Sequence, residues 1–386
     1  MKIVIHDYSC HPFTLEVASY FAKKGHLVNY LFSKQINLTG TYYKEHKHKN
    51  LKFTPIIEKK KIKKFNLISR RFIEIEHGNI SWKVIKNFQP QLIFFANLPI
   101  DPLYFLIKEC KKSNFKTVFW VQDIYHLAIK NYFKKIPLIG RLIYKHYQLI
   151  EKKCSILSDK NIFISSTFKK FFPINKSKNY TINNWIPLDV IRNYRADCAV
   201  EKKLKIESKF TFMYTGTISL KHQYENLILL AISFPDKNII ILSEGKFAEI
   251  LKKSSKYLKN LRVYPLVSYQ ELPKYLFYAN VTLVNLKDEA ADLCVPSKIL
   301  TYCALSKPIL ASVPKNSPVN IMILNNNIGL TSIPTDNVSY LDNARLLSEN
   351  KKLRNKFSHN ALKFAKEKFN INFVYKKFDE IIHSIF

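Results

Sequence analysis

Gly216 and Lys221 lie in a segment whose residue types suit the binding of a phosphate group. Gly216 ends the apolar run FTFMYTG (210–216), and Lys221 lies in the turn before a helix that we expect near 223–233. A glycine between strand and helix lets the backbone approach a phosphate, the first N–H groups of the helix bind it, and a lysine compensates its charge. The alternative is a tight turn with a solvated lysine. The segment matches neither GxGxxG nor the Walker pattern, so it does not favour a nicotinamide cofactor or ATP hydrolysis.

A second phosphate-binding candidate occupies 291–310 (ADLCVPSKILTYCALSKPIL). Pro296 ends a loop, Ser297 has the residue type of a helix N-cap, and Lys298 opens a helix with an apolar face. Two helix starts in one domain, each with a lysine or a hydroxyl, suit a diphosphate. The alternative is an ordinary capped helix with a solvated lysine.

The elements that would position these residues form two α/β domains. Apolar strand-like runs alternate with helix-length stretches, as expected for parallel sheets buried on both faces. A charged segment, 193–209, separates the two series, and we place the domain boundary within 195–209. We expect doubly wound domains over 1–200 and 201–369, a C-terminal helix (370–386) that returns to the first, and a ligand-binding cleft between them. The expected strands are 2–6, 25–32, 92–96, 117–121, 161–165, 210–216, 238–245, 260–267, 281–286 and 308–313.

The composition indicates an anionic partner and a reducing compartment. Among 386 residues, 62 Lys+Arg face 29 Asp+Glu, a formal net charge of +33, although lysine-rich usage also fits an AT-rich genome. Six scattered cysteines, with no CxxC pair and no Cys/His cluster, favour reduced thiols in the cytoplasm and no metal site. No signal peptide opens the chain, and the apolar run 92–100 is far shorter than the ~20 residues of a transmembrane helix.

Taken together, these segments resemble a known family over nearly the whole chain. In order, they are KKGHLV (23–28), VQDIYHLAI (121–129), TINNWIP (181–187), YTGTISLKHQYENL (214–227), LSEGKFAEIL (242–251), VPSKILTYCALSKPILAS (295–312) and the closing FA..KF (364–369). They resemble retaining, nucleotide-sugar-dependent glycosyltransferases of the GT-B architecture, which has two Rossmann-like domains. The resemblance is to family 4-like enzymes of bacterial capsule, O-antigen and exopolysaccharide biosynthesis, and it implies a hexosyl- or N-acetylhexosaminyl-transferase.

The resemblance implies that the second domain binds the nucleotide sugar, with UDP favoured over GDP. Lys221 matches the family lysine on the donor diphosphate, and Gly216 matches the glycine of the preceding turn. Ser297 and Lys298, after Pro296, match the polar pair facing the phosphates. The strand ends expected to border the nucleobase are Gly245, Leu266 and Val267. Because lysines and helix ends neutralise the leaving diphosphate, we expect no metal and no other cofactor.

Some positions depart from the family pattern. Two glutamates eight positions apart are typical, and the corresponding positions here are Leu293 and Thr301. Asp292, one residue away, would replace the first, and Thr301 would bond a ribose hydroxyl. Thr217 stands where an arginine is common, so Lys298 would supply the second positive charge. These departures leave an alternative open, a catalytically degenerate protein that binds a nucleotide sugar or glycan without turnover.

On the first domain, the resemblance implies acceptor-side residues. Asp123 follows a buried strand, and we expect it to position the acceptor or act as a base, unless it only caps the helix beginning at Ile124. His126, His6 and His11 are further acceptor-side candidates, although histidine at a strand end is more often structural.

Basic runs in the first domain indicate a membrane surface. The segment 130–153 alternates lysines with Ile136, Leu138, Leu142 and other apolar residues, which suits an interfacial helix on anionic lipid. The alternative is a helix that packs its apolar side inward. A polyprenyl-diphosphate-linked glycan acceptor would require peripheral attachment to the inner face of the plasma membrane. Specific nucleic-acid binding is not expected, because no RNA- or DNA-binding module is present.

Overall fold

The computed structural model describes residues 1–37, 39–40, 42–60, 67–133, 137–173, 175, 177–185, 194–206, 209–219, 221–288, 297–368 and 371–386. The chain divides into two compact units. Unit 1 comprises Met1–Asn184 and Ile371–Phe386, and unit 2 comprises Trp185–Asn370. The second unit therefore begins at Trp185, ahead of the 195–209 segment in which the sequence placed the boundary.

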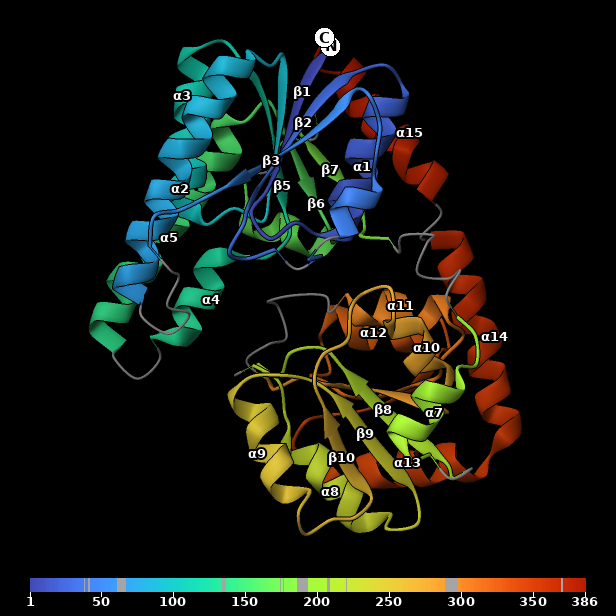
Figure 1. Cartoon of the computed structure of the whole chain (residues 1–386). Helices are drawn as coiled ribbons and strands as arrows, with labels where there is room; N and C mark the ends of the chain where they lie inside the picture. Colours follow the sequence, from blue (N-terminus) through green and yellow to red (C-terminus); the bar gives the residue numbers. More distant parts are fainter. Residues whose placement is uncertain are drawn as a thin grey trace. The chain divides into compact units, whose positions relative to one another are not determined.

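Unit 1 is a seven-stranded sheet in the order β3-β2-β1-β4-β5-β6-β7, and every paired strand is parallel. Helices α2, α3 and α5 lie on one face of this sheet, and α1 and α15 on the other (Figure 1). The strands are β1 (Lys2–Asp7), β2 (Leu27–Ser33), β3 (Leu51–Ile56), β4 (Leu92–Ala96), β5 (Lys116–Val121), β6 (Lys160–Phe163) and β7 (Asn179–Thr181). The helices are α1 (Pro12–Lys23), α2 (Leu67–Phe88), α3 (Ile100–Lys112), α4 (Tyr125–Tyr132), α5 (Pro137–Leu157) and α15 (Ile371–His383), with short 3₁₀ turns at Tyr42–Glu45 and Ser166–Phe171.

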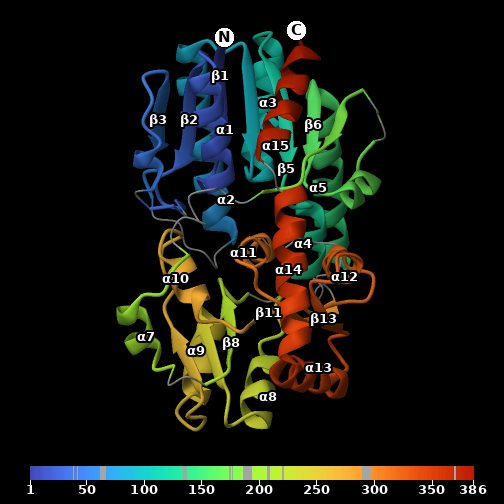
Figure 2. The same cartoon turned by 90° about the vertical axis from the view of Figure 1, so that its right-hand side faces the viewer.

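The C-terminal helix α15 packs beside α1 within unit 1 (Figure 2). The rings of Tyr20 and Tyr375 stack with centroids 3.9 Å apart, and the Tyr20 hydroxyl donates to Asp379 at 2.6 Å. Phe378 is fully buried and lies against Phe21, Phe94 and Trp120. Aromatic residues of the last helix thus complete the core of the first sheet.

Unit 2 is a six-stranded parallel sheet in the order β10-β9-β8-β11-β12-β13. Its core contains buried side chains such as Phe212, Leu230 and Ile239. The strands are β8 (Thr211–Thr215), β9 (Asn238–Leu242), β10 (Leu261–Tyr264), β11 (Val281–Asn285), β12 (Ile309–Ser312) and β13 (Gly329–Ser332). The helices are α7 (Cys198–Leu204), α8 (Glu225–Ser233), α9 (Lys246–Ser254), α10 (Leu272–Phe277), α11 (Lys298–Ala304), α12 (Pro318–Asn325), α13 (Asn337–Glu349) and α14 (Lys351–Lys368).

Each sheet reverses its winding direction at one place, between β1 and β4 in unit 1 and between β8 and β11 in unit 2. Loops that follow the two strands flanking such a switch point diverge to opposite faces of the sheet, which leaves a crevice at the carboxyl ends of the strands where open α/β sheets bind ligands. The predicted fold class, two Rossmann-like doubly wound units, is confirmed. The switch points are the places to search for function.

Candidate functional site

Gly216 lies at the switch point of unit 2. It follows β8 directly and has φ +105°, a left-handed conformation that glycine adopts without steric cost. Its N–H donates to the carbonyl of Leu242 on β9 at 2.9 Å. Further along the same loop, the carbonyl of Lys221 accepts from the N–H of Lys287, just after β11, at 2.9 Å. The loop after β8 is therefore anchored at the ends of β9 and β11.

Lys298 reaches the same turn from α11. The Tyr302 hydroxyl of this helix accepts from the backbone N–H of Thr215 at 3.1 Å and bonds its side-chain oxygen at 3.0 Å. Lys298 Nζ lies 3.6 Å from the centroid of the Tyr214 ring, and a β-carbon at position 216 would lie 3.5 Å from Nζ. Tyr302 thus fixes α11 to the end of β8 and places the Lys298 ammonium beside Gly216.

His222 connects the two lysines electrostatically. Its side chain is buried, and Nδ1 accepts from the backbone N–H of Ser219 at 3.0 Å. Burial, followed by the positive charges of Lys298 and Lys221, lowers the pKa of His222 to about 3. The structure thus places Lys298 at the Gly216 turn and Lys221 in the loop that follows it, and their joint binding of a phosphate stays a prediction. His222 itself was missed by the sequence analysis, although it follows Lys221 directly.

Among the described residues of unit 2, three buried polar groups at the carboxyl ends of strands β9, β11 and β12 have no hydrogen-bond partner. They are Ser243 Oγ after β9, Asn285 Nδ2 at the end of β11 and Ser312 Oγ at the end of β12, each without a partner within the described part of the chain. A buried polar atom left unpaired costs about 1–3 kcal/mol. Orphaned groups on both sides of a switch point are therefore typical of a surface that binds a polar ligand.

The remaining predicted donor residues are placed as follows. Gly245 precedes α9 and has φ +94°. Leu266 and Val267 follow the edge strand β10 and are partly buried, whereas Thr217 is exposed. Thr301 lies within α11 and is buried, so its predicted bond to a ribose stays a prediction. Ser297 occupies the position before α11, but its side chain makes no capping hydrogen bond, so the predicted capping role is wrong. Asp292, Leu293 and Pro296 lie outside the described residues.

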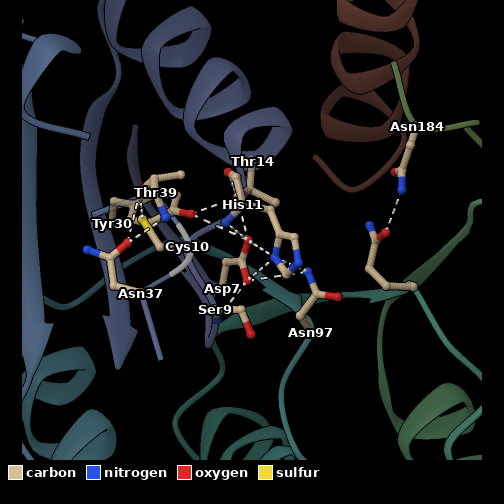
Figure 3. Close-up of polar contacts among 11 residues, drawn as sticks. Asp7, Ser9, Cys10, His11, Thr14, Tyr30, Asn37, Thr39, Asn97 and Asn184 are labelled. Atoms are coloured by element: carbon tan, nitrogen blue, oxygen red, sulfur yellow. Dashed lines mark hydrogen bonds and ion pairs between the residues drawn. The ribbon is translucent and has the colours of Figure 1, made fainter. Parts of the chain in front are cut away.

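In unit 1, Asp7 organises the loop at the switch point between β1 and β4 (Figure 3). This fully buried carboxylate accepts from the backbone N–H groups of Ser9 (3.1 Å) and His11 (2.8 Å) and from the Thr14 hydroxyl (2.6 Å). His11 Nδ1 lies 3.1 Å from both carboxylate oxygens. Burial opposes ionisation of Asp7, but the His11 charge and the bonds from His11 and Thr14 outweigh it and lower the pKa of Asp7.

Two further residues belong to this site. Asn97, just after β4, places Nδ2 3.3 Å from Asp7 Oδ1 and 3.0 Å from His11 Nδ1. Asp123, which is exposed after β5, acts on His11 by its charge. The structure thus brings the predicted residues His11 and Asp123 into one electrostatic neighbourhood. Asp7 and Asn97 were missed by the sequence analysis; the four-residue spacing of Asp7 and His11 was the available signal.

The other two predicted histidines on this side are buried, and their acceptor-side roles stay predictions. His6 is fully buried in β1, and its Nε2 lies 2.8 Å from Nε2 of His77 on α2. His126 is 1% exposed, and its Nδ1 bonds Glu151. Glu151 also accepts from the backbone N–H groups of Tyr125 (2.9 Å) and His126 (3.1 Å), which open α4. Glu151 therefore accepts hydrogen bonds from the first two N–H groups of α4.

Helix α5 presents apolar side chains to solvent. Leu138, Leu142 and Leu149 are 82%, 71% and 59% exposed, with Arg141 and Lys145 exposed between them. Positions four and seven apart share one helix face. The same helix buries Glu151, Cys154 and Ser155. It therefore has both a face that packs inward and exposed apolar side chains. Among the described residues, no helix is long and apolar enough to span a bilayer, and no group of three or more His, Cys, Asp or Glu side chains is arranged to hold a metal ion.

Comparisons with known proteins support the fold. WcaI of Escherichia coli K12, a protein assigned to glycosyl transfer in colanic acid biosynthesis, is 33% identical over 103 residues. That match covers 26% of this chain and 25% of WcaI, so it spans about a quarter of the curated relative. No protein-family model matches the chain.

Solved structures match over the whole length. A glycosyltransferase from Rickettsia africae has a TM-score of 0.68 at 16% identity and covers 100% of this chain and 98% of its own. Anabaena HepE, solved with UDP and glucose, has a TM-score of 0.73 at 13% identity and covers 100% of both chains. WaaG, a glycosyltransferase of lipopolysaccharide biosynthesis, has a TM-score of 0.68 at 12% identity and covers 98% of this chain and 99% of its own. The chain therefore has the fold of GT-B glycosyltransferases, built from two Rossmann-like α/β domains.

Proposed function

We propose that this protein is a retaining glycosyltransferase that moves a sugar from a nucleotide-diphosphate sugar, UDP-linked rather than GDP-linked, to a lipid-linked oligosaccharide. The reaction would serve cell-surface polysaccharide synthesis. The single observation that carries the proposal is the position of the Lys298 ammonium beside the left-handed Gly216 at the switch point of unit 2, in front of the loop that carries Lys221. An ammonium group beside a left-handed glycine, with a second lysine in the following loop, suits a diphosphate, because positive charge offsets the charge that grows on it as the bond to the sugar breaks.

Further support comes from sequence and structural similarity. HepE was solved with UDP and glucose, which favours a UDP-sugar donor here. WcaI is assigned to colanic acid biosynthesis and WaaG to lipopolysaccharide biosynthesis, and both products are cell-surface glycans. Retention of configuration rests on the resemblance to family 4 enzymes, as does the expectation that no metal is needed. The proposed metal-independent mechanism leaves neutralisation of the leaving group to lysine.

The test is donor consumption by the purified protein. The protein is incubated with UDP-glucose, UDP-N-acetylglucosamine or GDP-mannose as the donor and with a synthetic polyprenyl-diphosphate-linked N-acetylglucosamine as the acceptor. Release of nucleoside diphosphate is followed with and without EDTA. We expect EDTA-resistant release from a UDP-sugar, and NMR of the product should show the donor's anomeric configuration. Nucleotide-sugar binding without turnover across a panel of lipid-linked acceptors would instead favour a catalytically degenerate protein.

We further propose that α5 docks unit 1 on an anionic membrane surface, where a lipid-linked acceptor resides. The exposed leucines at 138, 142 and 149 would enter the lipid interface, while Arg141 and Lys145 would contact anionic headgroups. Each such cation near the surface contributes about 1 kcal/mol. This arrangement would make the protein a peripheral protein of the inner face of the plasma membrane.

Vesicle co-sedimentation tests the docking. We expect the protein to bind phosphatidylglycerol vesicles more strongly than phosphatidylcholine vesicles, and the double variant Leu138→Gln/Leu142→Gln to lose most of this binding. Ile232→Gln is the matched control, because Ile232 is an apolar side chain of unit 2 that is 60% exposed. Equal sedimentation of wild type and the double variant would remove α5 as the docking element.

A further inference from the structure

The ammonium group of Lys298 lies over an aromatic ring of unit 2. Its Nζ is 3.6 Å from the centroid of the Tyr214 ring, well inside the ~6 Å within which a ring face attracts a cation. Nζ is buried and Tyr214 is 1% exposed, so little water screens the attraction. The contact is therefore of the desolvated kind, in which the attraction between cation and ring is strongest.

We propose that Tyr214 is a positioning residue for nucleotide binding, and that the face of its ring holds the Lys298 ammonium at the Gly216 turn before the diphosphate arrives. This inference rests on the proposed function, because it assigns Tyr214 a role in the same site. Tyr214 would act through Lys298 and not by contact with the nucleotide.

Gly216 leaves a path for the lysine. A β-carbon at position 216 would lie 3.5 Å from both Cε and Nζ of Lys298, so a side chain larger than that of alanine would meet the lysine. The φ of +105° at this position also favours glycine. The glycine that lets a phosphate approach the backbone therefore also lets Lys298 reach Tyr214.

Two successive residues of β8 hold helix α11 and its lysine. The backbone N–H of Thr215 donates to the Tyr302 hydroxyl at 3.1 Å, which fixes the helix. The preceding residue, Tyr214, contacts the first residue of the same helix, Lys298. Successive strand residues point to opposite faces of the sheet, so these two contacts hold α11 from different sides of the strand end.

The Tyr214 ring is itself held in place. It belongs to the buried core cluster of unit 2, together with Leu227 and Leu283. The His222 ring stands edge-on to it, at 88° and with the two centroids 6.3 Å apart. Because burial and the charges of Lys298 and Lys221 lower the pKa of His222 to about 3, this neighbour is neutral and does not compete with the ammonium for the ring.

A lysine that is already held binds an anion more tightly than a mobile one. Lysine has more rotamer freedom than most side chains, and a ligand that immobilises it loses affinity through that entropy. Contact with the ring restricts Lys298 beforehand, so less entropy is lost when the nucleotide binds. An ammonium has three N–H donors, and a ring face engages it from one side, so the contact still allows a bond to a phosphate oxygen.

The ring of Tyr214, and not its hydroxyl group, carries this role. Among the described residues, the buried Tyr214 hydroxyl has no hydrogen-bond partner. Tyr214→Phe therefore breaks no bond and keeps the ring face, so this conservative variant should retain UDP affinity. Tyr214→Leu removes the ring but also opens a cavity in the core, so it does not separate the two effects.

Fluorination of the ring separates the cation contact from packing. Fluorine atoms withdraw electrons from the ring face and weaken its attraction for a cation, while the shape of the ring changes little. Protein with phenylalanine at position 214 is compared with protein that carries mono-, di- and trifluorinated phenylalanine there, and UDP binding is measured by calorimetry. We expect the Kd to rise with each fluorine, by about 3- to 30-fold over the series. In the Lys298→Met background the series should have no effect, because the cation is absent.

NMR of the ligand-free protein tests the contact itself. The ring current of an aromatic side chain shifts protons above its face upfield. The Cε–H signals of Lys298, identified by their loss in Lys298→Met, should therefore lie upfield of those of an exposed lysine such as Lys252, both in the wild type and in Tyr214→Phe.

The matched control is the same fluorinated series at Phe212, a buried ring of the same strand that packs against Phe210 and Phe234. It should leave the Kd for UDP unchanged, because the ring that contacts Lys298 stays intact.

The outcomes separate this inference from the proposed function. A constant Kd across the series at position 214, or an equal rise in the Lys298→Met background, would overturn the role of Tyr214 and leave the proposed function standing. Lys298 signals at the position of exposed lysines would overturn it as well. Binding of neither UDP nor GDP by the wild type would instead overturn the proposed function and with it the role of Tyr214 in nucleotide binding, while the NMR signals would still show whether the ring holds Lys298.

Discussion

At the scale of single residues, the pKa of His222 reports on the positive charge near Gly216. Its pKa is about 3 because the ring is buried and because Lys298 and Lys221 disfavour a further positive charge. We predict that Lys298→Met raises the pKa of His222 toward the ordinary value of 6.5, since one of the two cations is removed. An NMR titration of ¹⁵N-histidine-labelled protein measures the pKa of His222.

The control for this titration is Lys252→Met, which removes the same charge from the exposed surface of α9. We expect it to leave His222 unchanged. A His222 pKa that stays at its wild-type value in both Lys298→Met and Lys221→Met would mean that the two ammonium groups do not converge at this turn.

Residue types alone predicted part of the site. Lys221 and Lys298 were predicted to bind one diphosphate, because both follow strand ends on the carboxyl side of a parallel sheet, and the structure places Lys298 at the Gly216 turn. The burial of His6 and His126 was not predicted, because residue type does not show on which face of the sheet a side chain lies or whether a neighbouring helix covers it. His6 lies in β1 and faces α2 through His77, whereas His11, in the loop after β1, is partly exposed.

At the scale of elements, Tyr302 fixes helix α11 to strand β8. Its hydroxyl accepts from the N–H of Thr215, and both residues are buried. We predict that Tyr302→Phe lowers the free energy of unfolding by about 1–3 kcal/mol, because it leaves that N–H without a partner. Urea denaturation gives the change in the free energy of unfolding. Nucleotide affinity should also fall, because α11 carries Lys298.

A matched variant is Tyr257→Phe, which removes a hydroxyl from a side chain that is 87% exposed. It should leave both stability and affinity unchanged. If Tyr302→Phe also unfolds at the wild-type urea concentration, the bond to Thr215 does not hold α11 in place.

The strands missed by the sequence analysis lie at sheet edges. The central strands were predicted because burial on both faces produces continuous apolar runs. In contrast, β3, β7 and β13 are edge strands with partly exposed residues, and β3 even contains Pro55, which an edge strand tolerates. Polar residues interrupt the apolar runs in these strands, so the sequence pattern does not predict them. The helix α5 was predicted from its alternation of lysine with apolar residues, but only the structure separates its exposed leucines from its buried face.

At the scale of the whole molecule, buried neutral histidines link stability to pH. Burial lowers the pKa of His6, His77 and His222 below 6.5, and at His222 the charges of Lys298 and Lys221 lower it further. The unfolded chain therefore binds more protons at these rings than the folded protein does once the pH approaches or falls below 6.5. Stability therefore falls with falling pH, by about 1.4 kcal/mol per pH unit for each such group. The raised pKa of His11 acts in the opposite direction and offsets part of this loss.

Urea denaturation at pH 7.5 and 5.5 checks the sign. We predict a lower free energy of unfolding at pH 5.5, and a smaller loss in His222→Gln, which lacks one titrating ring. The His222 contribution should persist down to a pH of about 3, where the folded protein also takes up the proton. Equal or greater stability at pH 5.5 would contradict the assignment of these rings as neutral.

The central claim, that unit 2 binds the diphosphate of a nucleotide at the Gly216 turn, is tested most directly by titration calorimetry with UDP and GDP. Hydrogen bonds to charged groups contribute about 1.5–3 kcal/mol each, so Lys221→Ala and Lys298→Ala should each raise the Kd by about 10- to 150-fold. Lys252→Ala should bind as the wild type does. Wild-type affinity in both site variants, or no binding of either nucleotide by the wild type, would contradict the account.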